Sequence, residues 1–208
     1  MRYELKYAVE HLSHEAIIAQ LMNHPASFRE LYPDRQVNNY YFDTPGFHCF
    51  HQNVEGHPRR KKMRLRWYGD NHLPTQHSVL ELKNKDKELG WKDTFKIDHK
   101  ITDGGTLVEA VKSAGQFKSE LNPVLKNTYL RSYLLSQDGK YRVTIDRQQA
   151  FAIPFTNMSH LQVDALPVVV ELKFEAADVE GAQYITDYLP YRQTKNSKYA
   201  TGVELLYL

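Results

Sequence analysis

The sequence contains almost no cysteine. Cys49 is the only one in a chain of 208 residues, so there is no disulfide framework and no thiolate metal site. A lone cysteine is more typical of a small buried side chain than of a catalytic nucleophile. The scarcity is compatible with a reducing compartment.

Long apolar runs and long blocks of one charge are also missing. No apolar run approaches the roughly 18 residues that a membrane span requires, and the chain starts with charged residues rather than the apolar part of a signal peptide. We therefore expect a cytoplasmic protein with no membrane insertion. The formal net charge is only +2, so an anion site must come from local concentration of lysine and arginine. No dinucleotide-binding fingerprint, P-loop or zinc spacing occurs.

The composition is ordinary for a globular protein, and one tripeptide recurs. With 41% hydrophobic and 25% charged residues, we expect one folded domain over residues 1–208. Glu-Leu-Lys stands at residues 4–6, 81–83 and 171–173. In a strand, residues i and i+2 share one face, so each copy would place glutamate and lysine together, with leucine opposite against a core. These strands could simply have solvated polar faces. The alternative, a shared charged face, depends on whether other strands add charge of one sign to the same kind of face.

Short alternating segments dominate the rest of the chain. The pattern predicts strands at 2–9, 37–43, 62–68, 78–85, 91–98, 141–147, 149–155 and 167–175. It predicts helices at 14–22 with Ser13 as N-cap, at 107–115 with Thr106 as N-cap, and at 178–189 before Pro190. We expect an α+β fold, mainly antiparallel β, in which eight strands close into a barrel with helices packed outside.

The other predicted strands add positive charge. In KKMRLRWY, Arg64 and Arg66 project together, opposite the apolar Met63, Leu65 and Trp67. In NTYLRSYL, the side chains at 129, 131 and 133 would project together if the segment is extended. In a closed barrel every second residue faces the lumen, so this face would attract a polyanion such as phosphate. Inward glutamates would then need a hard divalent cation.

Several segments follow one another along nearly the whole chain: ELKYAV, NNYYFDTPGF, MRLRWY, LELKNK, NTYLRSYL, YRVTIDR, VVELKFE and NSKYATG. Together they resemble the VTC domain, the polyphosphate polymerase branch of the triphosphate tunnel metalloenzymes. The resemblance implies a closed tunnel of eight antiparallel strands that binds ATP or another nucleoside triphosphate through its phosphates. It also implies Mn²⁺ or Mg²⁺, and growth of inorganic polyphosphate with release of ADP.

The resemblance also assigns residue roles. It implies that phosphate is bound or transferred by Lys6, Arg64, Arg66, Lys83, Arg131, Lys173 and Lys198. Substrate binding is assigned to Lys92, Tyr129, Lys195 and Ser197, of which the last two, with Lys198, match a Lys-x-Ser-Lys motif near the C-terminus. Glu171 matches the family's metal-ligating glutamate, and we expect Glu4 and Glu81, the glutamates of the other two Glu-Leu-Lys copies, to be metal ligands as well. For each residue the alternative is a surface salt bridge.

One departure from the family pattern separates two activities. The hydrolase branch opens with Glu-x-Glu-x-Lys, whereas this first strand has Arg2, Glu4 and Lys6. Loss of an acid removes a metal ligand or a group that activates water, which favours a polymerase. Two alternatives stay open: a metal-dependent inorganic or nucleoside triphosphatase, and a non-catalytic sensor of polyphosphate or triphosphate.

Some residues have simpler interpretations. An RNA-binding function is weaker because no aromatic platform is evident among the tyrosines, and we expect no nucleic-acid partner. His48 and His51 lack the spacing of a metal site, and Asp43 in FDTPG is interpreted as a turn residue. Asp146 shares a predicted face with Arg142 and could orient a cation of the site or form an ion pair.

Overall fold

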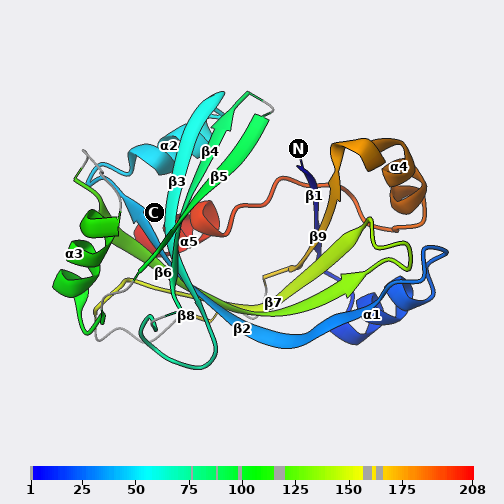
Figure 1. Ribbon diagram of the computed structural model, residues 1–208, viewed down its shortest axis with the longest axis horizontal. Coiled ribbons are helices and arrows are strands. Elements are labelled where there is room, and N and C mark those ends of the chain that lie inside the picture. The colour runs from blue at the N-terminus through cyan, green and yellow to red at the C-terminus, as the bar shows by residue number, and fades with distance from the viewer. Residues whose placement is uncertain are drawn as a thin grey trace. The chain divides into compact units, whose positions relative to one another are not determined.

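The computed structural model is an α+β fold built on antiparallel pairing (Figure 1). It describes residues 2–75, 77–87, 89–97, 100–114, 120–156, 161–162 and 166–208. The elements, in chain order, are β1 (Arg2–Val9), α1 (His14–Met22), β2 (Arg29–Asp43), α2 (His48–Val54), β3 (Arg59–Tyr68), β4 (Val79–Asp86), β5 (Leu89–Lys96), α3 (Gly104–Ala114), β6 (Asn122–Leu135), β7 (Arg142–Ala152), β8 (Leu161–Gln162), β9 (Val168–Glu175), a 3-10 turn (Ala176–Asp178), α4 (Val179–Asp187) and α5 (Lys198–Tyr207).

The strands pair in the order β1-β9-β7-β6-β2-β3-β4-β5, and β8 pairs with β7 beside this path. Within the part of the chain that the structure describes, no pairing joins β5 to β1. The α+β, antiparallel prediction is therefore confirmed, whereas closure of the sheet into a tunnel is not.

Two compact units divide the chain. The first comprises residues 1–35, 129–149 and 163–196, and the second comprises 36–128, 150–162 and 197–208. Strands β2, β6 and β7 contribute residues to both units. That residues 1–208 form a single domain therefore stays a prediction.

In the first unit, a sheet face packs against helices α1 and α4. Leu172 on β9, Ile17 on α1 and Ile185 on α4 belong to one buried apolar cluster, and Leu5 on β1 packs against it. Helix α1 begins as predicted, because the side chain of Ser13 accepts a hydrogen bond from the backbone N–H of Ala16. The leucine of each Glu-Leu-Lys in this unit thus lies on the core side of its strand.

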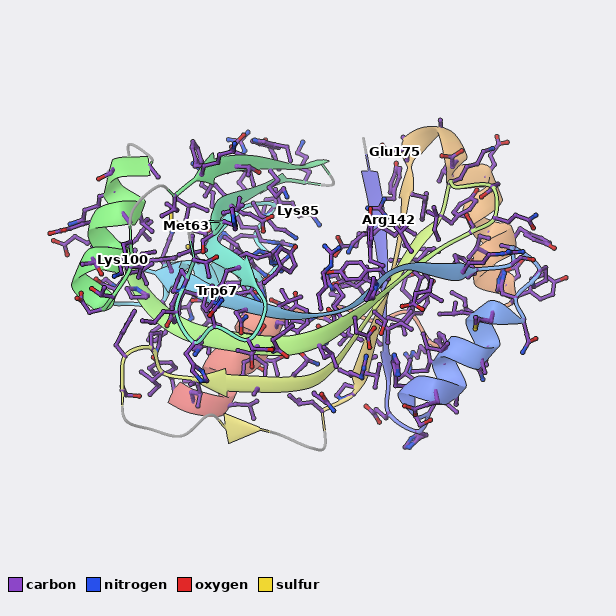
Figure 2. The ribbon with its side chains drawn as sticks, turned by 60° about the horizontal axis from the view of Figure 1, so that its bottom comes forward. Met63, Trp67, Lys85, Lys100, Arg142 and Glu175 are labelled. Atoms are coloured by element: carbon purple, nitrogen blue, oxygen red, sulfur yellow. The ribbon has the colours of Figure 1, made fainter. Side chains whose placement is uncertain are left out.

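In the second unit, β3 and β4 pack against α3. Figure 2 labels Met63 and Trp67 on β3, and both belong to a buried cluster with Leu65 and with Leu107 of α3. Leu82, from the middle Glu-Leu-Lys, packs against the same cluster. The predicted alternation is therefore confirmed here: Met63, Leu65 and Trp67 lie on the helix side of β3, and Arg64 and Arg66 lie on the other.

Several boundaries differ from the prediction. Segments 141–147 and 149–155 form the single strand β7, which continues through Gln148 in the left-handed region (φ 52°) and ends at Ala152. The prediction had no separate strand for β6 and no helix at α2 or α5. Helix α3 starts at Gly104 rather than after Thr106, because an oxygen of Asp103 accepts the hydrogen bond from the Thr106 backbone N–H. Residues 98 and 115, at the ends of two predicted elements, lie outside the described residues.

Candidate functional site

One face of strands β3, β4 and β5 carries a concentration of basic residues, here called the basic face. Strand register places Lys62 opposite Lys83, and Lys83 opposite Lys92. The neighbouring row places Arg64 opposite Glu81. Because residues opposite each other and two apart along a strand share one face, the described basic residues of this face are Arg60, Lys62, Arg64, Arg66, Lys83, Lys85, Lys92 and Lys96.

Glu81 is the acid of this face in the described chain. One carboxylate oxygen accepts a hydrogen bond from Arg64 Nε at 2.6 Å, and the other accepts one from Lys92 Nζ at 2.7 Å. Burial by itself would raise the pKa of Glu81, but the charges of Arg64, Arg66 and Lys92 hold that pKa well below its usual range. Glu81 is therefore ionised at neutral pH and fixes two of the cations in place.

Polar partners orient the buried end of the same face. Arg66 is 8% exposed and donates from Nε to the side-chain oxygen of Asn39 on β2 at 2.9 Å. Asn39 is in turn 3.5 Å from the side-chain oxygen of Asn127 on β6. These contacts fix the orientation of the Arg66 guanidinium within the basic face.

Helix α5 begins on the basic face. Lys62 Nζ donates to Ser197 Oγ at 2.8 Å, and the same oxygen accepts from the backbone N–H of Ala200 at 3.3 Å. Ser197 is therefore the N-cap of α5, and Lys198 in its first turn is buried. The next residue, Tyr199, stacks on Tyr41 of β2 at 5.2 Å between ring centroids.

A second group of charged residues lies in the first unit and is here called the Glu171 cluster. Register places Lys6 of β1 opposite Glu171 of β9, and Glu4 opposite Lys173, so opposite charges alternate across the two strands. Thr144 of β7 stands opposite Glu171 on the other side. Figure 2 labels Arg142 on β7, which stands opposite Lys173, and Glu175 at the end of β9.

Both oxygens of Glu171 contact cations. Lys6 Nζ lies 3.4 Å from Oε1, and Oε2 accepts from Lys173 Nζ at 2.6 Å and from an Arg131 nitrogen at 3.4 Å. Lys6 Nζ is also 3.0 Å from Glu4. Burial by itself would lower the pKa of Lys6, but Glu171 and Glu4 raise it above its ordinary value, so Lys6 stays charged.

Arg131 of β6 is held by Asp146 of β7. Its Nε and one terminal nitrogen donate to the two oxygens of Asp146 at 2.5 and 2.6 Å, which is the bidentate geometry of a strong ion pair. Its guanidinium carbon lies 5.2 Å from the ring centroid of Tyr129. Asp146, which the sequence left ambiguous, therefore orients a predicted phosphate ligand by forming an ion pair with it.

The donor set can be compared with what a divalent cation needs. The described residues contain no group of three or more His, Cys, Asp or Glu side chains able to hold a metal ion. Glu171 and Glu4 nevertheless lie on one face of neighbouring strands and share Lys6. Mg²⁺ and similar ions are commonly bound by one or two carboxylates plus substrate phosphates, and this pair fits such an ion. Glu81, the third predicted metal ligand, lies in the other unit, where it binds Arg64 and Lys92.

The predicted site residues therefore fall into two sets, one in each unit. The Glu171 cluster contains Lys6, Glu4, Arg131, Lys173 and Glu171, with Tyr129 beside it. The basic face contains Arg64, Arg66, Lys83, Lys92 and Glu81, with Ser197 and Lys198 at the start of α5. Lys195 is exposed and belongs to neither set. All these roles stay predictions.

Sequence reasoning missed some participants. Lys62 stands in the same row as Lys83 and Lys92, and its spacing of two from Arg64 could have identified it. Asn39 and Asn127 gave no signal, because they meet only in the fold. Asp43 is more than a turn residue: it accepts from the backbone N–H groups of Cys49 and Phe50 at 2.9 Å, which caps α2, and from the hydroxyl of Tyr199.

Solved structures resemble this fold across nearly the whole chain. A presumed adenylate cyclase from Vibrio parahaemolyticus matches at a TM-score of 0.56 with 15% identity, covering 96% of this chain and 97% of its own. A presumed adenylate cyclase from Bacillus halodurans matches at 0.54 with 14% identity, covering 100% and 98%. A protein from Pyrococcus horikoshii matches at 0.51 with 12% identity, covering 98% and 96%. At these identities the likeness shows the fold alone.

The remaining comparisons bear on family and on membrane segments. No helix in the described part of the chain is long and apolar enough to cross a membrane. Curated protein sequences give no significant match. The family profile of the VTC domain matches residues 1–207, and the chain therefore belongs to the VTC domain family.

Proposed function

We propose that the protein is a polyphosphate polymerase-like phosphotransferase. It binds a nucleoside triphosphate and inorganic polyphosphate, and it transfers the γ-phosphate to the end of a growing polyphosphate chain with the help of Mn²⁺ or Mg²⁺. The observation that carries the proposal is the basic face, where lysine and arginine follow one another across three strands with Glu81 as their acid. Membership of the VTC domain family supports it.

The basic face suits an extended polyanion better than a single small anion. Directly opposed like charges, such as Lys62, Lys83 and Lys92, destabilise a sheet, and an anion lying across the row offsets that repulsion. Arginine can contact two phosphate oxygens at once, whereas lysine acts as a compact point charge. A chain of phosphates presents its charges at regular intervals, as the basic residues of this face do.

Phosphoryl transfer needs positioning and charge stabilisation more than it needs a protein nucleophile. Charge spreads over the equatorial oxygens of the transferring group while the entering and leaving oxygens stay in line. Arg64 and Arg66, each fixed by a polar partner, would hold such oxygens without moving. The attacking group is then the terminal phosphate of the growing chain, and the leaving group is the nucleoside diphosphate.

Glu171 and Glu4 would hold the divalent ion. Bound there, the ion would supply positive charge to phosphate oxygens, as metal ions do in other phosphoryl transfers. Lys6, Lys173 and Arg131 lie within 3.4 Å of the Glu171 carboxylate. Their positive charges would help to neutralise the phosphate oxygens bound beside Glu171. Asp146 would hold Arg131 in position through its two hydrogen bonds.

A triphosphatase is the second candidate, and the composition of β1 argues against it. The chain has Arg2 where the hydrolase branch has a glutamate, so a carboxylate that could activate water is missing.

One experiment separates the activities. The purified full chain is incubated with ATP and Mn²⁺, and the products are resolved by chain length. Long polyphosphate together with ADP supports the polymerase. Orthophosphate without longer chains indicates a triphosphatase. Binding of polyphosphate without any product indicates a sensor, and absence of both binding and turnover overturns the proposal.

A further inference from the structure

A chain of buried amide groups connects the basic face to neighbouring strands. Arg66 Nε of β3 donates to the side-chain oxygen of Asn39 on β2 at 2.9 Å. The side-chain nitrogen of Asn39 lies 3.5 Å from the backbone and side-chain oxygens of Asn127 on β6, and the Asn127 side chain donates to the backbone oxygen of Ala150 on β7 at 3.2 Å. Both asparagines are fully buried, and all four residues belong to the second unit.

The direction of these hydrogen bonds fixes the amide of Asn39. The backbone oxygen of Ala150 can only accept, so the Asn127 nitrogen faces it and the Asn127 oxygen is turned toward Asn39. Asn39 then presents its nitrogen to Asn127 and its oxygen to Arg66. Turning either amide over would bring like groups together where no water can bond them, which is unfavourable. Residues on two further strands therefore provide the acceptor for Arg66.

The partner at the Arg66 Nε is neutral, unlike the partner of the neighbouring arginine. Arg64, two residues earlier on the same face of β3, donates from Nε to the Glu81 carboxylate at 2.6 Å. That carboxylate offsets the charge of the arginine it holds. Asn39 accepts the same kind of bond with an amide oxygen. It fixes the plane of the guanidinium without adding a negative charge beside it.

We propose that Asn39 is a positioning residue for phosphate binding: its buried amide, oriented by Asn127, holds Arg66 in place without adding negative charge to the basic face. The inference rests on the proposed function, because it takes Arg66 as a phosphate ligand. A carboxylate at position 39 would bond the same Nε but weaken the attraction of Arg66 for a polyanion. An apolar side chain would leave Arg66 Nε without its buried partner and free the guanidinium to turn.

The test measures the affinity for tripolyphosphate by calorimetry, well below the melting temperature, in Asn39→Leu, Asn39→Asp and the control Asn38→Leu. Asn38 is also buried, and it donates to the backbone oxygen of Gly69 at 2.8 Å. It lies on the opposite face of β2, so its substitution removes a comparable hydrogen bond away from Arg66. Both Asn39 variants should weaken binding by about 5-fold or more, and Asn38→Leu should change it by less than about 2-fold. Asn39→Asp should melt above Asn39→Leu, because it still accepts from Arg66.

A double-mutant cycle separates positioning from a general effect on the fold. In an Arg66→Met background, Asn39→Leu should change the affinity for tripolyphosphate by less than about 2-fold, because the residue through which Asn39 acts is gone. An effect of equal size with and without Arg66 overturns the inference. Wild-type affinity in either Asn39 variant, or an equal loss in Asn38→Leu, also overturns it. All of these outcomes leave the proposed function in place.

A measurement on the unmodified chain avoids any effect of substitution on folding. In nuclear magnetic resonance spectra of the wild type, the Nε–H of Arg66 should exchange with water far more slowly than that of exposed Arg29, because its acceptor is a buried oxygen. Its signal should shift when tripolyphosphate is added. Fast exchange, or a signal that tripolyphosphate leaves unchanged, overturns the inference. Failure of the wild type to bind tripolyphosphate overturns both the inference and the proposed function.

Discussion

Lys62 and Lys83 stand directly opposite each other on β3 and β4, and the row continues to Lys92 on β5. Like charges in this position destabilise an antiparallel pair by up to roughly 1 kcal/mol. Glu81 lies in the next row, where it binds Arg64 and Lys92. The lysine row therefore places like charges side by side at some cost to the stability of the sheet.

The first prediction concerns this row. Lys83→Met should weaken tripolyphosphate binding by about 1.5 to 3 kcal/mol, the usual contribution of hydrogen bonds to charged groups, and should leave the free energy of unfolding unchanged or raise it. Calorimetry and urea denaturation measure the two effects. The matched control is Lys61→Met, because Lys61 is exposed on the opposite face of β3. Equal loss of affinity in both variants would show that the face does not matter.

The second prediction concerns the core side of the same strand. Leu65 is fully buried in the cluster with α3, so Leu65→Ala should lower the free energy of unfolding by about 2 to 5 kcal/mol. The affinity of the folded molecules for tripolyphosphate should stay the same. Arg64→Met should lower both quantities, because it removes a phosphate ligand and also a partner of buried Glu81. A stable Leu65→Ala variant with weakened binding would contradict the assignment of faces.

The third prediction follows from the lowered pKa of Glu81. A carboxyl group whose pKa is lower in the folded than in the unfolded chain contributes stability that is fully present above the unfolded pKa, about 4.3. That contribution is lost as the pH falls below this value toward the folded pKa. Glu81→Gln should therefore be less stable than the wild type at pH 7. The difference in unfolding free energy between the two proteins should shrink as the pH falls below about 4. A difference that is constant with pH would show that Glu81 makes no net ionic contribution.

Much of the sheet follows from local pattern, and the reason is visible in β3. Met63, Leu65 and Trp67 alternate with basic residues, and this period of two fixes both the strand and its faces. The three Glu-Leu-Lys copies behave in the same way, with leucine in or against a core each time. For these segments, the local alternation is enough to identify the strand and its two faces.

The rest depends on contacts between distant residues. Helix α5 has a local N-cap, Ser197, but contacts with distant residues fix its position. Lys62 donates a hydrogen bond to the Ser197 hydroxyl. Gly202 packs so closely against Leu125 that an added Cβ would lie 2.5 Å from it. Strand β6 is buried along much of its length on both faces, so it lacks the alternation that marks an amphipathic strand. The meeting of Asn39 with Asn127 likewise has no trace in local sequence, because only pairing between distant strands creates it.

The fourth prediction concerns the divalent ion. In the wild type, Mn²⁺ added together with tripolyphosphate should raise the melting temperature. Glu171→Gln should abolish this rise and also metal-dependent turnover, because an amide lacks the charge that holds a hard cation. The control is Glu175→Gln at the exposed end of the same strand, which should keep both. Without ligand, Glu171→Gln should also be less stable, since Lys6, Lys173 and Arg131 lose a shared counter-ion. Electron paramagnetic resonance of bound Mn²⁺ measures the metal directly.

The last prediction separates two roles of Ser197. As the N-cap of α5, Ser197 should contribute about 0.5 to 2 kcal/mol to stability, and Ser197→Ala should remove this. Ser197→Asp should restore stability, because aspartate also caps helices. It should nevertheless weaken tripolyphosphate binding, because it places a negative charge beside Lys62 and Lys198. If Ser197→Asp binds tripolyphosphate as tightly as the wild type, the start of α5 lies outside the phosphate site, and Ser197 is a helix cap alone.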